Sequence, residues 1–446
     1  MHLSVLNDPD LLLGLWRGTI KKYEPDNIST WDWAVLKNVK VWKAHGHTVA
    51  AAVPFIPASF GRAPRNPAEK INSGYKAWEF QLYIYGLGPT LFRHILPDCY
   101  WKNYCKLVAG IRILQRRVIT PEKLRDAHNL LLDFIEEFED LYYRRQESRI
   151  HFVRHSVHLL SHIAPETVRA GPLACYAQWT IETLIGNLGS EIRQDRDPYA
   201  NLAQRAILRA QLNSIQALFP DLKISKRSGA LSTPSGNARD FGDGFWLLPR
   251  REETPKPLSA QEYQVFMTYW QDQGWPNHDK WPNAVSRWAR AQLPNGQRAR
   301  SIWCETVMRT SSTSPLRRTS CVEITTCNDG RTRIANVQFY FCMRFGENLH
   351  PLVMVSLFSN PDQPLLSESS GTVYLCDTLD GISGLRVIPL KSIKTVVSMF
   401  PDAQVTAAGD IVITNKFSLL QHPFIELAEC GLLEDDEEER EIQLEN

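Results

Sequence analysis

The sequence predicts an α+β fold, in which a mainly helical N-terminal part is followed by a C-terminal antiparallel β module. Up to about residue 218, apolar residues recur mostly at the three- and four-residue spacing of amphipathic helices. From about residue 299 they alternate in β-branched runs such as CVEITTC, RIANVQFYFCMRF, LVMVSLF and DIVITN, which is typical of strands. Between the two patterns, the Ser- and Gly-rich residues 222–240 predict a linker.

Composition and charge indicate an ordinary globular chain. The 446 residues are 43% hydrophobic and 22% charged, and their number suggests two or three domains. Residues 1–240 carry 31 Lys and Arg against 23 Asp and Glu, whereas the remainder carries 19 against 26, with the excess acids after Leu433. A basic body with an acidic tail permits contact with nucleic acid but does not require it.

Cysteine use and hydropathy bear on the compartment. The nine cysteines include no CxxC pair, and their odd number favours reduced thiols in an intracellular protein, nuclear or cytoplasmic rather than secreted. No apolar run approaches the ~20 residues that span a bilayer, so no membrane association is expected.

The helical part begins at the first residues of the chain. Residues 1–20 predict a helix, residues 29–53 a second helix and a strand, and residues 54–76 a proline-rich loop. The following residues, to about Leu218, predict further helices. One helix start is marked by TPE at residues 120–122, because threonine caps a helix and proline fits its first turn.

The C-terminal part changes character twice. Residues 241–298 contain five tryptophans and predict short helices, residues 299–430 predict a small antiparallel sheet or barrel, and residues 431–446 predict a solvated, disordered acidic tail. The alternating core positions of the β module are expected to be Val337, Phe339, Phe341, Val353, Val355 and Leu357.

A stripe of four histidines stands in HFVRHSVHLLSHI. His151, His155, His158 and His162 lie four, three and four residues apart, which places them near one face of a helix. Imidazoles are good zinc ligands, but one straight helix offers at most an i,i+4 pair to a tetrahedral ion. The alternative is a polar helix face packed on backbone or carboxylates.

A basic loop follows the first helices. The segment SFGRAPRNPAEKINSGYK carries Arg62, Arg65, Lys70 and Lys76 among prolines that stiffen the backbone. Cations on a pre-ordered loop suit phosphate contacts along DNA or RNA. The alternative is that the same side chains tie the loop to carboxylates.

The segment QWTIETLIGNLG, residues 178–189, predicts a buried helix with one acid, Glu182, among its apolar positions. A carboxylate beside an apolar face is unfavourable unless it is paired, protonated or bound to a metal. An ion pair with Arg193 is one explanation. The other is a metal-binding acid of a two-metal phosphoryl-transfer site.

Several longer segments, taken in order, resemble one protein family. They are MHLSVLNDPDLLLGLWRG, WKAHG, SFGRAPRNPAEKINSGYKAWEF, YIYGLGPTL, LPDCYW, HFVRHSVHLLSHIAPE and QWTIETLIGNLGSEIRQDRDPYANLAQR. Over roughly residues 1–430 the chain resembles transposase-derived proteins of mushroom-forming fungi, of the Plavaka type within the CACTA-like group. The resemblance implies a cut-and-paste DNA transposase with an RNase H-like core, in which two aspartates and one glutamate bind two Mg²⁺ ions. It also implies a large helical insertion before the glutamate.

The resemblance gives Glu182 a role. The family's glutamate stands in a Trp-Thr-x-Glu-Arg segment, which Trp179, Thr180 and Glu182 match. The resemblance therefore implies that Glu182 is the remnant of the acidic triad and the residue to hold Mg²⁺ if a site survives. It also implies that residues 1–221 are a partial RNase H-like core with its helical insertion.

The chain also departs from the family. The arginine that follows the glutamate is Thr183 here, and the two aspartates would fall before Met1. Asp8 and Asp10 follow the matching motif and are not expected to replace them. One carboxylate cannot hold two magnesium ions, so neither bound Mg²⁺ nor strand transfer is expected of this chain alone.

Three functions remain as hypotheses. The first is a catalytically inactive, transposase-derived protein with residual DNA binding through the basic loop and Arg193. The second is a co-opted nuclear protein-interaction module that uses the β module. The third is an active Mg²⁺-dependent transposase completed by an upstream exon. Because the first strands of the core would be missing, residues 1–220 are expected to lack a sheet to cover and to be poorly soluble, whereas residues 240–430 should behave well alone.

Overall fold

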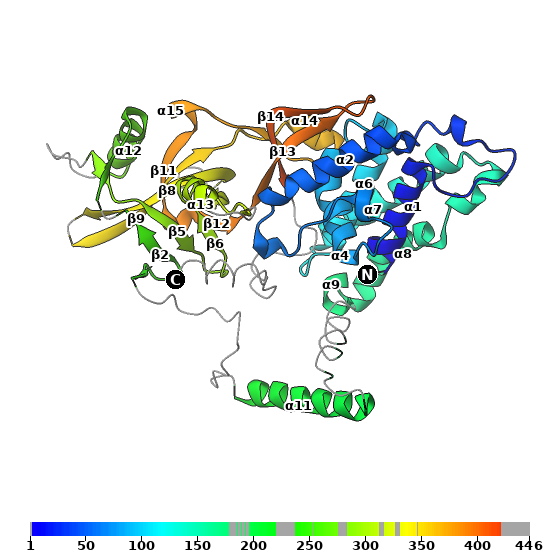
Figure 1. Cartoon of the computed structure of the whole chain (residues 1–446), viewed down its shortest axis with the longest axis horizontal. Helices are drawn as coiled ribbons and strands as arrows, with labels where there is room; N and C mark the ends of the chain where they lie inside the picture. The colour runs from blue at the N-terminus through cyan, green and yellow to red at the C-terminus, as the bar shows by residue number, and fades with distance from the viewer. Residues whose placement is uncertain are drawn as a thin grey trace.

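The chain folds into a helical part and a sheet part, in the order of its two hydrophobic patterns (Figure 1). The predicted α+β class with an antiparallel C-terminal sheet is confirmed. The computed structural model describes residues 2–177, 196–219, 237–252, 254–274, 283–311, 316–325, 331–345 and 347–420, together with Ile185, Gly189 and Ile192. The acidic tail and most of the predicted linker lie outside these residues.

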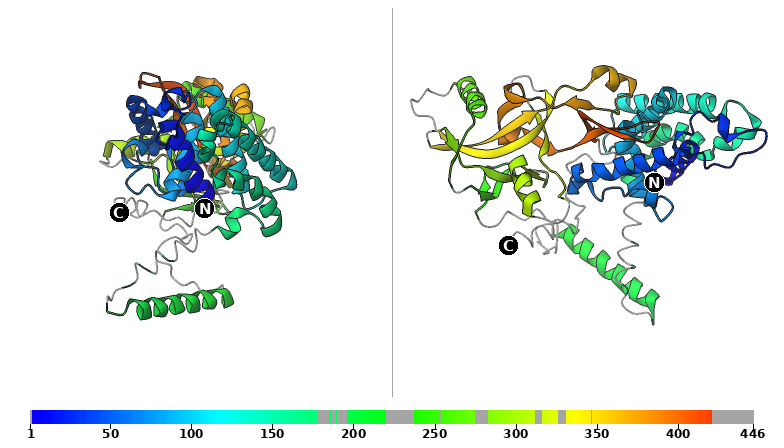
Figure 2. Two further views of the ribbon diagram at one scale, coloured as in Figure 1. Left: turned by 90° about the vertical axis from the view of Figure 1, so that its right-hand side faces the viewer. Right: turned by 45° about the horizontal axis from the view of Figure 1, so that its top comes forward.

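Residues 2–177 form helices and loops only, as far as the structure describes them. Thr120 caps α7 as expected, because its hydroxyl accepts a hydrogen bond from the Lys123 amide at 3.3 Å. The longer helical segments are η1 (His2–Asn7), α1 (Asp8–Arg17), α2 (Val39–Ala52), η6 (Gln81–Leu87), α6 (Asp98–Leu114), α7 (Pro121–Phe138), η8 (Glu147–Phe152) and α8 (His155–Ala170). The shorter ones are η2 (Ile28–Thr30), η3 (Val35–Lys37), η4 (Val53–Phe55), η5 (Ala58–Phe60), α3 (Pro67–Lys70), α4 (Ala77–Phe80), α5 (Gly88–Leu91), η7 (Glu139–Tyr143) and α9 (Leu173–Tyr176). A further helix, α11 (Pro198–Leu218), stands apart from this group (Figures 1 and 2).

The strand expected within residues 29–53 is wrong. Helix α2 occupies this stretch, and Val41, His45, Val49 and Ala52 are buried on it. Their spacing of four and three residues is helical, so the valines that suggest a strand serve one face of a helix instead.

The sheet part contains mainly antiparallel strands. Its strands are β1 (Arg239–Asp240), β2 (Trp246–Arg251), β3 (Lys256–Pro257), β4 (Ala284–Val285), β5 (Trp288–Gln292), β6 (Arg298–Arg300), β7 (Cys321–Thr325), β8 (Thr332–Phe345), β9 (Asn348–Leu357), β10 (Leu375–Asp377), β11 (Leu385–Pro389), β12 (Ile393–Val396), β13 (Ser398–Val405) and β14 (Ile411–Leu420). Its helices are α12 (Ala260–Asp272), α13 (Ile302–Ser311), α14 (Gln363–Glu368), α15 (Gly381–Gly384) and η9 (Leu390–Ser392).

The Trp-rich segment, residues 241–298, is not the run of short helices that was expected. Its described residues form α12, the four strands β2 to β5 and the first residue of β6, and Trp288 of β5 lies buried in the core of the sheet. Tryptophans distinguish a helix from a strand only through their spacing, and here they are too far apart to define a period.

A nine-stranded antiparallel sheet is built around β8. The main path runs β1-β2-β5-β8-β7-β12, while β9 pairs with β8, β11 with β9, and β6 with β5. The six expected core residues of the β module are all buried. A register shift between Val337 and Phe339 assigns them to two faces: Val337 packs in one cluster, whereas Phe339 and Phe341 pack with Phe266 and Trp270 of α12.

A second, three-stranded sheet, β10-β14-β13, joins the two parts. Its side chains Phe400, Val405 and Leu420 belong to the same core cluster as Trp16 and Tyr104 of the helical part. Figures 1 and 2 show β13 and β14 between the helices and the larger sheet. The expectation that the helices have no sheet to cover is therefore wrong, because C-terminal strands supply one.

None of the described helices is long and apolar enough to cross a bilayer.

Candidate nucleic-acid interface

The predicted acidic remnant, Glu182, and its alternative partner, Arg193, lie outside the described residues. Within the described part of the chain, no three His, Cys, Asp or Glu side chains gather as a metal site would require. The Mg²⁺ site that the resemblance implies would depend on Glu182, which the structure does not describe.

Asp8 and Asp10, near the start of the helical part, have different surroundings. Asp8 is 2% exposed, and neither of its carboxylate oxygens has a hydrogen-bond partner among the described residues. Burial raises the pKa of Asp8 to about 7, although the nearby Ser156 hydroxyl and Arg154 guanidinium act in the opposite direction. Asp10 is exposed and pairs with Arg154, Oδ2 to Nη1, at 2.9 Å. The two carboxylates thus do not act as a pair.

The four histidines do not share one helix. His151 lies in η8, before α8 begins at His155, and its Nε2 is 2.6 Å from the Lys21 carbonyl oxygen. His155, His158 and His162 are exposed on α8, and the Nε2 atoms of His158 and His162 lie 3.2 Å apart. His151 thus contacts a backbone carbonyl, as the polar-face alternative expects. His158 and His162 form an i,i+4 pair on α8.

Arg65 of the basic loop has a structural role. Its Nε and Nη2 donate to the two carboxylate oxygens of Glu79 at 2.7 Å each, and Nη2 also donates to the Gly74 carbonyl at 3.0 Å. The Glu79 side chain is fully buried, while that of Arg65 is 44% exposed. Burial alone would raise the pKa of Glu79, but the hydrogen bonds from Arg65 and from the Lys76 and Arg65 amides outweigh it and lower the pKa. Arg65 therefore ties the loop to a carboxylate, which is the alternative to a phosphate contact.

The other three cations of the loop are free to meet a ligand. Arg62, Lys70 and Lys76 are exposed, and none of these side chains forms an ion pair with another described residue. The loop packs closely against α2, and Gly46 permits this close approach. A Cβ atom at Gly46 would lie 2.1 Å from Asn66 Oδ1 and could not be accommodated.

The same loop forms the junction with the sheet part. Residues 54–61 are tied to strands and loops that follow residue 296. Hydrogen bonds between described residues contribute to this junction: Arg318 N to Pro54 O at 2.8 Å, Ser398 Oγ to Phe55 O at 2.7 Å, Gln297 Nε2 to Ser59 Oγ at 3.2 Å, and Arg317 Nη2 to Gly61 O at 2.7 Å.

Arginines gather along this junction from segments that are distant in the sequence. We name them the arginine seam: Arg62, Arg290, Arg298, Arg300, Arg317 and Arg318. Arg290 and Arg300 are direct partners on β5 and β6, and Arg300 Nη1 donates to the Arg317 carbonyl at 3.0 Å. The Arg318 guanidinium lies 4.2 Å from the centre of the Phe55 ring, which keeps it on the helical part.

The arginine seam brings several positive charges close together. Arg290 and Arg300 lie directly opposite each other on β5 and β6. The nearby carboxylate of Glu305 is buried, and it accepts hydrogen bonds from Thr319 N at 2.7 Å and Ser320 Oγ at 3.1 Å. The positive charge of the seam would attract a polyanion.

A polar cavity elsewhere is a weaker candidate. It measures about 300 Å³ and is lined by Pro25, Asp26, Asn27, Thr30, Arg144, Gln146 and Arg149. Its cations are already paired: Arg149 Nη2 lies 2.7 Å from Asp26 Oδ1, and Arg144 Nη2 lies 2.7 Å from Asp32 Oδ1. Both guanidinium groups also lie about 5 Å from the centre of the Trp33 ring. The charged groups that line the cavity therefore bind one another and stabilise the fold.

Most of the arginine seam was missed by sequence reasoning. Arg62 was predicted, but its neighbours in space follow more than 220 residues later. The dense pairs in QRARS and LRRTS were the only local signal, and such pairs are common on ordinary surfaces. Comparison of the chain with models of protein families, with curated proteins and with solved structures gives no match.

Proposed function

We propose that this chain is a transposase-derived DNA-binding protein whose arginine seam contacts the phosphate backbone of a duplex. The gathering of six arginines from both parts of the chain along one junction carries this proposal. Guanidinium groups are suited to phosphate because they are always charged and donate in a fork, and backbone contacts need no base-reading side chains.

The junction also favours the proposal through its rigidity. Hydrogen bonds donated by the sheet part hold the loop around Gly61 against the sheet, so the cations are positioned before a ligand arrives. A pre-ordered set of cations loses less entropy on binding than one on a free loop. Arg62 and Arg298 form no ion pair or side-chain hydrogen bond with another described residue, and we assign them direct phosphate contacts.

The family origin and the RNase H-like core remain part of this proposal and rest on the resemblance. The family's chemistry needs three carboxylates on two Mg²⁺ ions, of which the resemblance assigns Glu182 alone to this chain. We therefore expect binding without strand cleavage or joining. Incubation with supercoiled plasmid and Mg²⁺ should leave the plasmid intact, and nicking that is lost in Glu182→Gln would overturn this part.

A double variant of Arg62 and Arg298 tests whether the arginine seam binds DNA. Fluorescence anisotropy of a labelled duplex would compare the natural chain, Arg62→Gln/Arg298→Gln, and the control Arg125→Gln, which removes an exposed arginine of α7. Two lost phosphate contacts should weaken binding roughly tenfold at low salt, while the control should bind like the natural chain. Equal affinities of all three, or no binding by the natural chain, would reject the seam as the interface.

A further inference from the structure

Helix α11 is a stable element by its sequence but not by its packing. The Asp197 side chain caps its first turn by accepting from the Ala200 amide at 3.4 Å, and its 21 residues span about 31 Å. None of its residues is buried, and Figures 1 and 2 show it apart from the two main parts. Most of the stability of a helix in a protein comes from the packing of its apolar face, so a partner on that face would stabilise α11.

One face of α11 carries an apolar stripe. Leu208, Leu212, Ile215 and Phe219 follow one another at spacings of four, three and four residues, which aligns them along the helix. Their exposed fractions are 48%, 44%, 42% and 58%. This is the pattern of a helix that covers a partner, here with the partner missing from the described residues.

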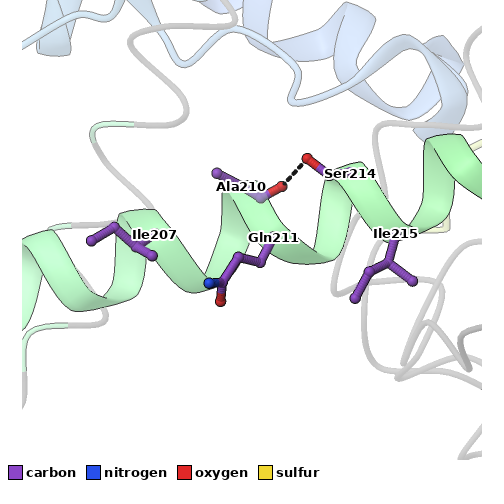
Figure 3. A pocket seen from close by; sticks show the side chains of 5 residues that line it. All are labelled: Ile207, Ala210, Gln211, Ser214 and Ile215. Atoms are coloured by element: carbon purple, nitrogen blue, oxygen red, sulfur yellow. Dashed lines mark hydrogen bonds between the residues drawn. The ribbon is translucent and has the colours of Figure 1, made fainter.

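A shallow hollow lies beside the stripe. Ile207, Ala210, Gln211, Ser214 and Ile215 line it (Figure 3). Its one hydroxyl is already satisfied, because Ser214 Oγ donates to the Ala210 carbonyl at 2.9 Å within the helix. The hollow therefore suits an apolar side chain of a partner.

The charge of α11 narrows the class of partner. The helix contains Arg205 and Arg209 and no Asp or Glu. Each arginine precedes a leucine of the stripe by three residues, so both cations flank the stripe. A segment that combines apolar side chains with carboxylates would match this face.

The size of the face argues for a partner within the same chain. A helix about 31 Å long and about 10 Å wide offers a footprint of roughly 300 Å², whereas a stable association of separate proteins needs about 800 Å² on each side. A tethered segment meets its target at an effective concentration in the millimolar range, so a small face is sufficient.

We propose that the acidic C-terminal segment, residues 432–446, docks on the exposed face of α11. This segment, LLEDDEEEREIQLEN, lies outside the described residues and carries eight acids and one arginine. Its Leu433, Ile442 and Leu444 match the apolar stripe, and its carboxylates match Arg205 and Arg209. The chain after β14 is long enough to lie along the helix, because 26 extended residues reach about 85 Å.

Hydrogen exchange of α11 tests this contact, independently of DNA binding. We expect the amides of residues 200–218 to exchange at least tenfold more slowly in the full chain than in a chain that ends at Gly431. Arg205→Glu/Arg209→Glu should lose this protection, and adding Glu437→Lys/Glu438→Lys/Glu439→Lys should restore it. The control Ala203→Glu adds an acid on the side of α11 away from the stripe and should keep the protection.

Three results would overturn the inference. Equal exchange of α11 with and without the acidic segment would show that the segment does not cover it. Protection that grows with protein concentration would assign the face to a second copy. If the variant with both sets of charges reversed failed to regain protection, the acids of the C-terminal segment would not pair with the arginines of α11.

Discussion

Two buried carboxyl groups, Asp8 and Glu79, show how surroundings decide the state of an acid. Glu79 receives hydrogen bonds from Arg65 and from two amides, and its pKa is lowered in spite of its burial. Asp8 lacks such partners, and its pKa rises to about 7. The pairing of Arg65 with a carboxylate was one of the two alternatives that the sequence left open for the basic loop. The sequence did not reveal Asp8, because an acid in the first turn of a helix ordinarily faces solvent.

Asp8 makes stability depend on pH. The folded pKa of about 7 lies above the ordinary value of 3.8, so the folded chain holds this proton more tightly than the unfolded chain. The contribution is complete below pH 3.8 and is lost as the pH rises through 7, by roughly 4 kcal/mol at about 1.4 kcal/mol per pKa unit. Asp8→Asn should raise the free energy of unfolding at pH 8 by about 1–3 kcal/mol and flatten its fall between pH 5 and 8.

Urea unfolding at several pH values measures this effect. Asp10→Asn is the matched control, because an exposed ion pair contributes less than about 1 kcal/mol, and it should keep the pH dependence of the natural chain. An Asp8→Asn variant that is less stable at pH 8 than the natural chain would contradict the buried, proton-binding state of Asp8.

At the scale of elements, the regular periods were predictable and the interruptions were not. The runs that predicted strands coincide with β7 to β9, and the helix start predicted at residues 120–122 coincides with the start of α7. The bulge in β8 escaped prediction, because an extra residue that turns Phe339 and Phe341 to the second face leaves no mark in an apolar run. The strand wrongly expected in α2 has the same origin, since valine suits both structures.

Arg112 of α6 links two elements that no sequence pattern connects. It is 7% exposed and donates to the carbonyls of Tyr85, Gly86 and Thr372 at 2.7, 3.1 and 3.0 Å, so it joins η6 to the segment before β10. Burial lowers its pKa to about 10, and it stays charged at neutral pH. Arg112→Met should lower the free energy of unfolding by about 3–5 kcal/mol, because three buried carbonyls lose their donor.

Denaturant unfolding of the purified variant measures this loss. Arg112→Lys keeps the charge but not the fork, and should recover only part of the stability. A cost below about 1 kcal/mol for Arg112→Met would show that the link contributes little to the fold.

At the scale of the whole molecule, the two parts depend on each other. Phe400, Val405 and Leu420 are 1%, 2% and 2% exposed because they enter the helical core. The sequence separates the parts by a linker, and it gives no sign that the last strands return to the first helices. Such long-range pairing leaves no local pattern, which is why the independent behaviour predicted for residues 240–430 now requires revision.

The shared core predicts that the sheet part does not behave well alone. A chain of residues 237–420 would expose the apolar side chains of β13 and β14 to water, so we expect it to bind hydrophobic dye and to aggregate. The full chain should melt in one transition that involves both parts. A soluble fragment that melts cooperatively at the temperature of the full chain would contradict the shared core.

The contact proposed between the arginine seam and DNA phosphates depends on charge, so the salt dependence of DNA binding measures it. The logarithm of the association constant should fall linearly with the logarithm of salt concentration, with a slope that loses about 0.9 for each phosphate contact removed. We expect the slope of Arg62→Gln/Arg298→Gln to be shallower than that of the natural chain by about 1.8, with Arg125→Gln unchanged. Identical slopes for the natural chain and the double variant would show that Arg62 and Arg298 do not contact DNA phosphates.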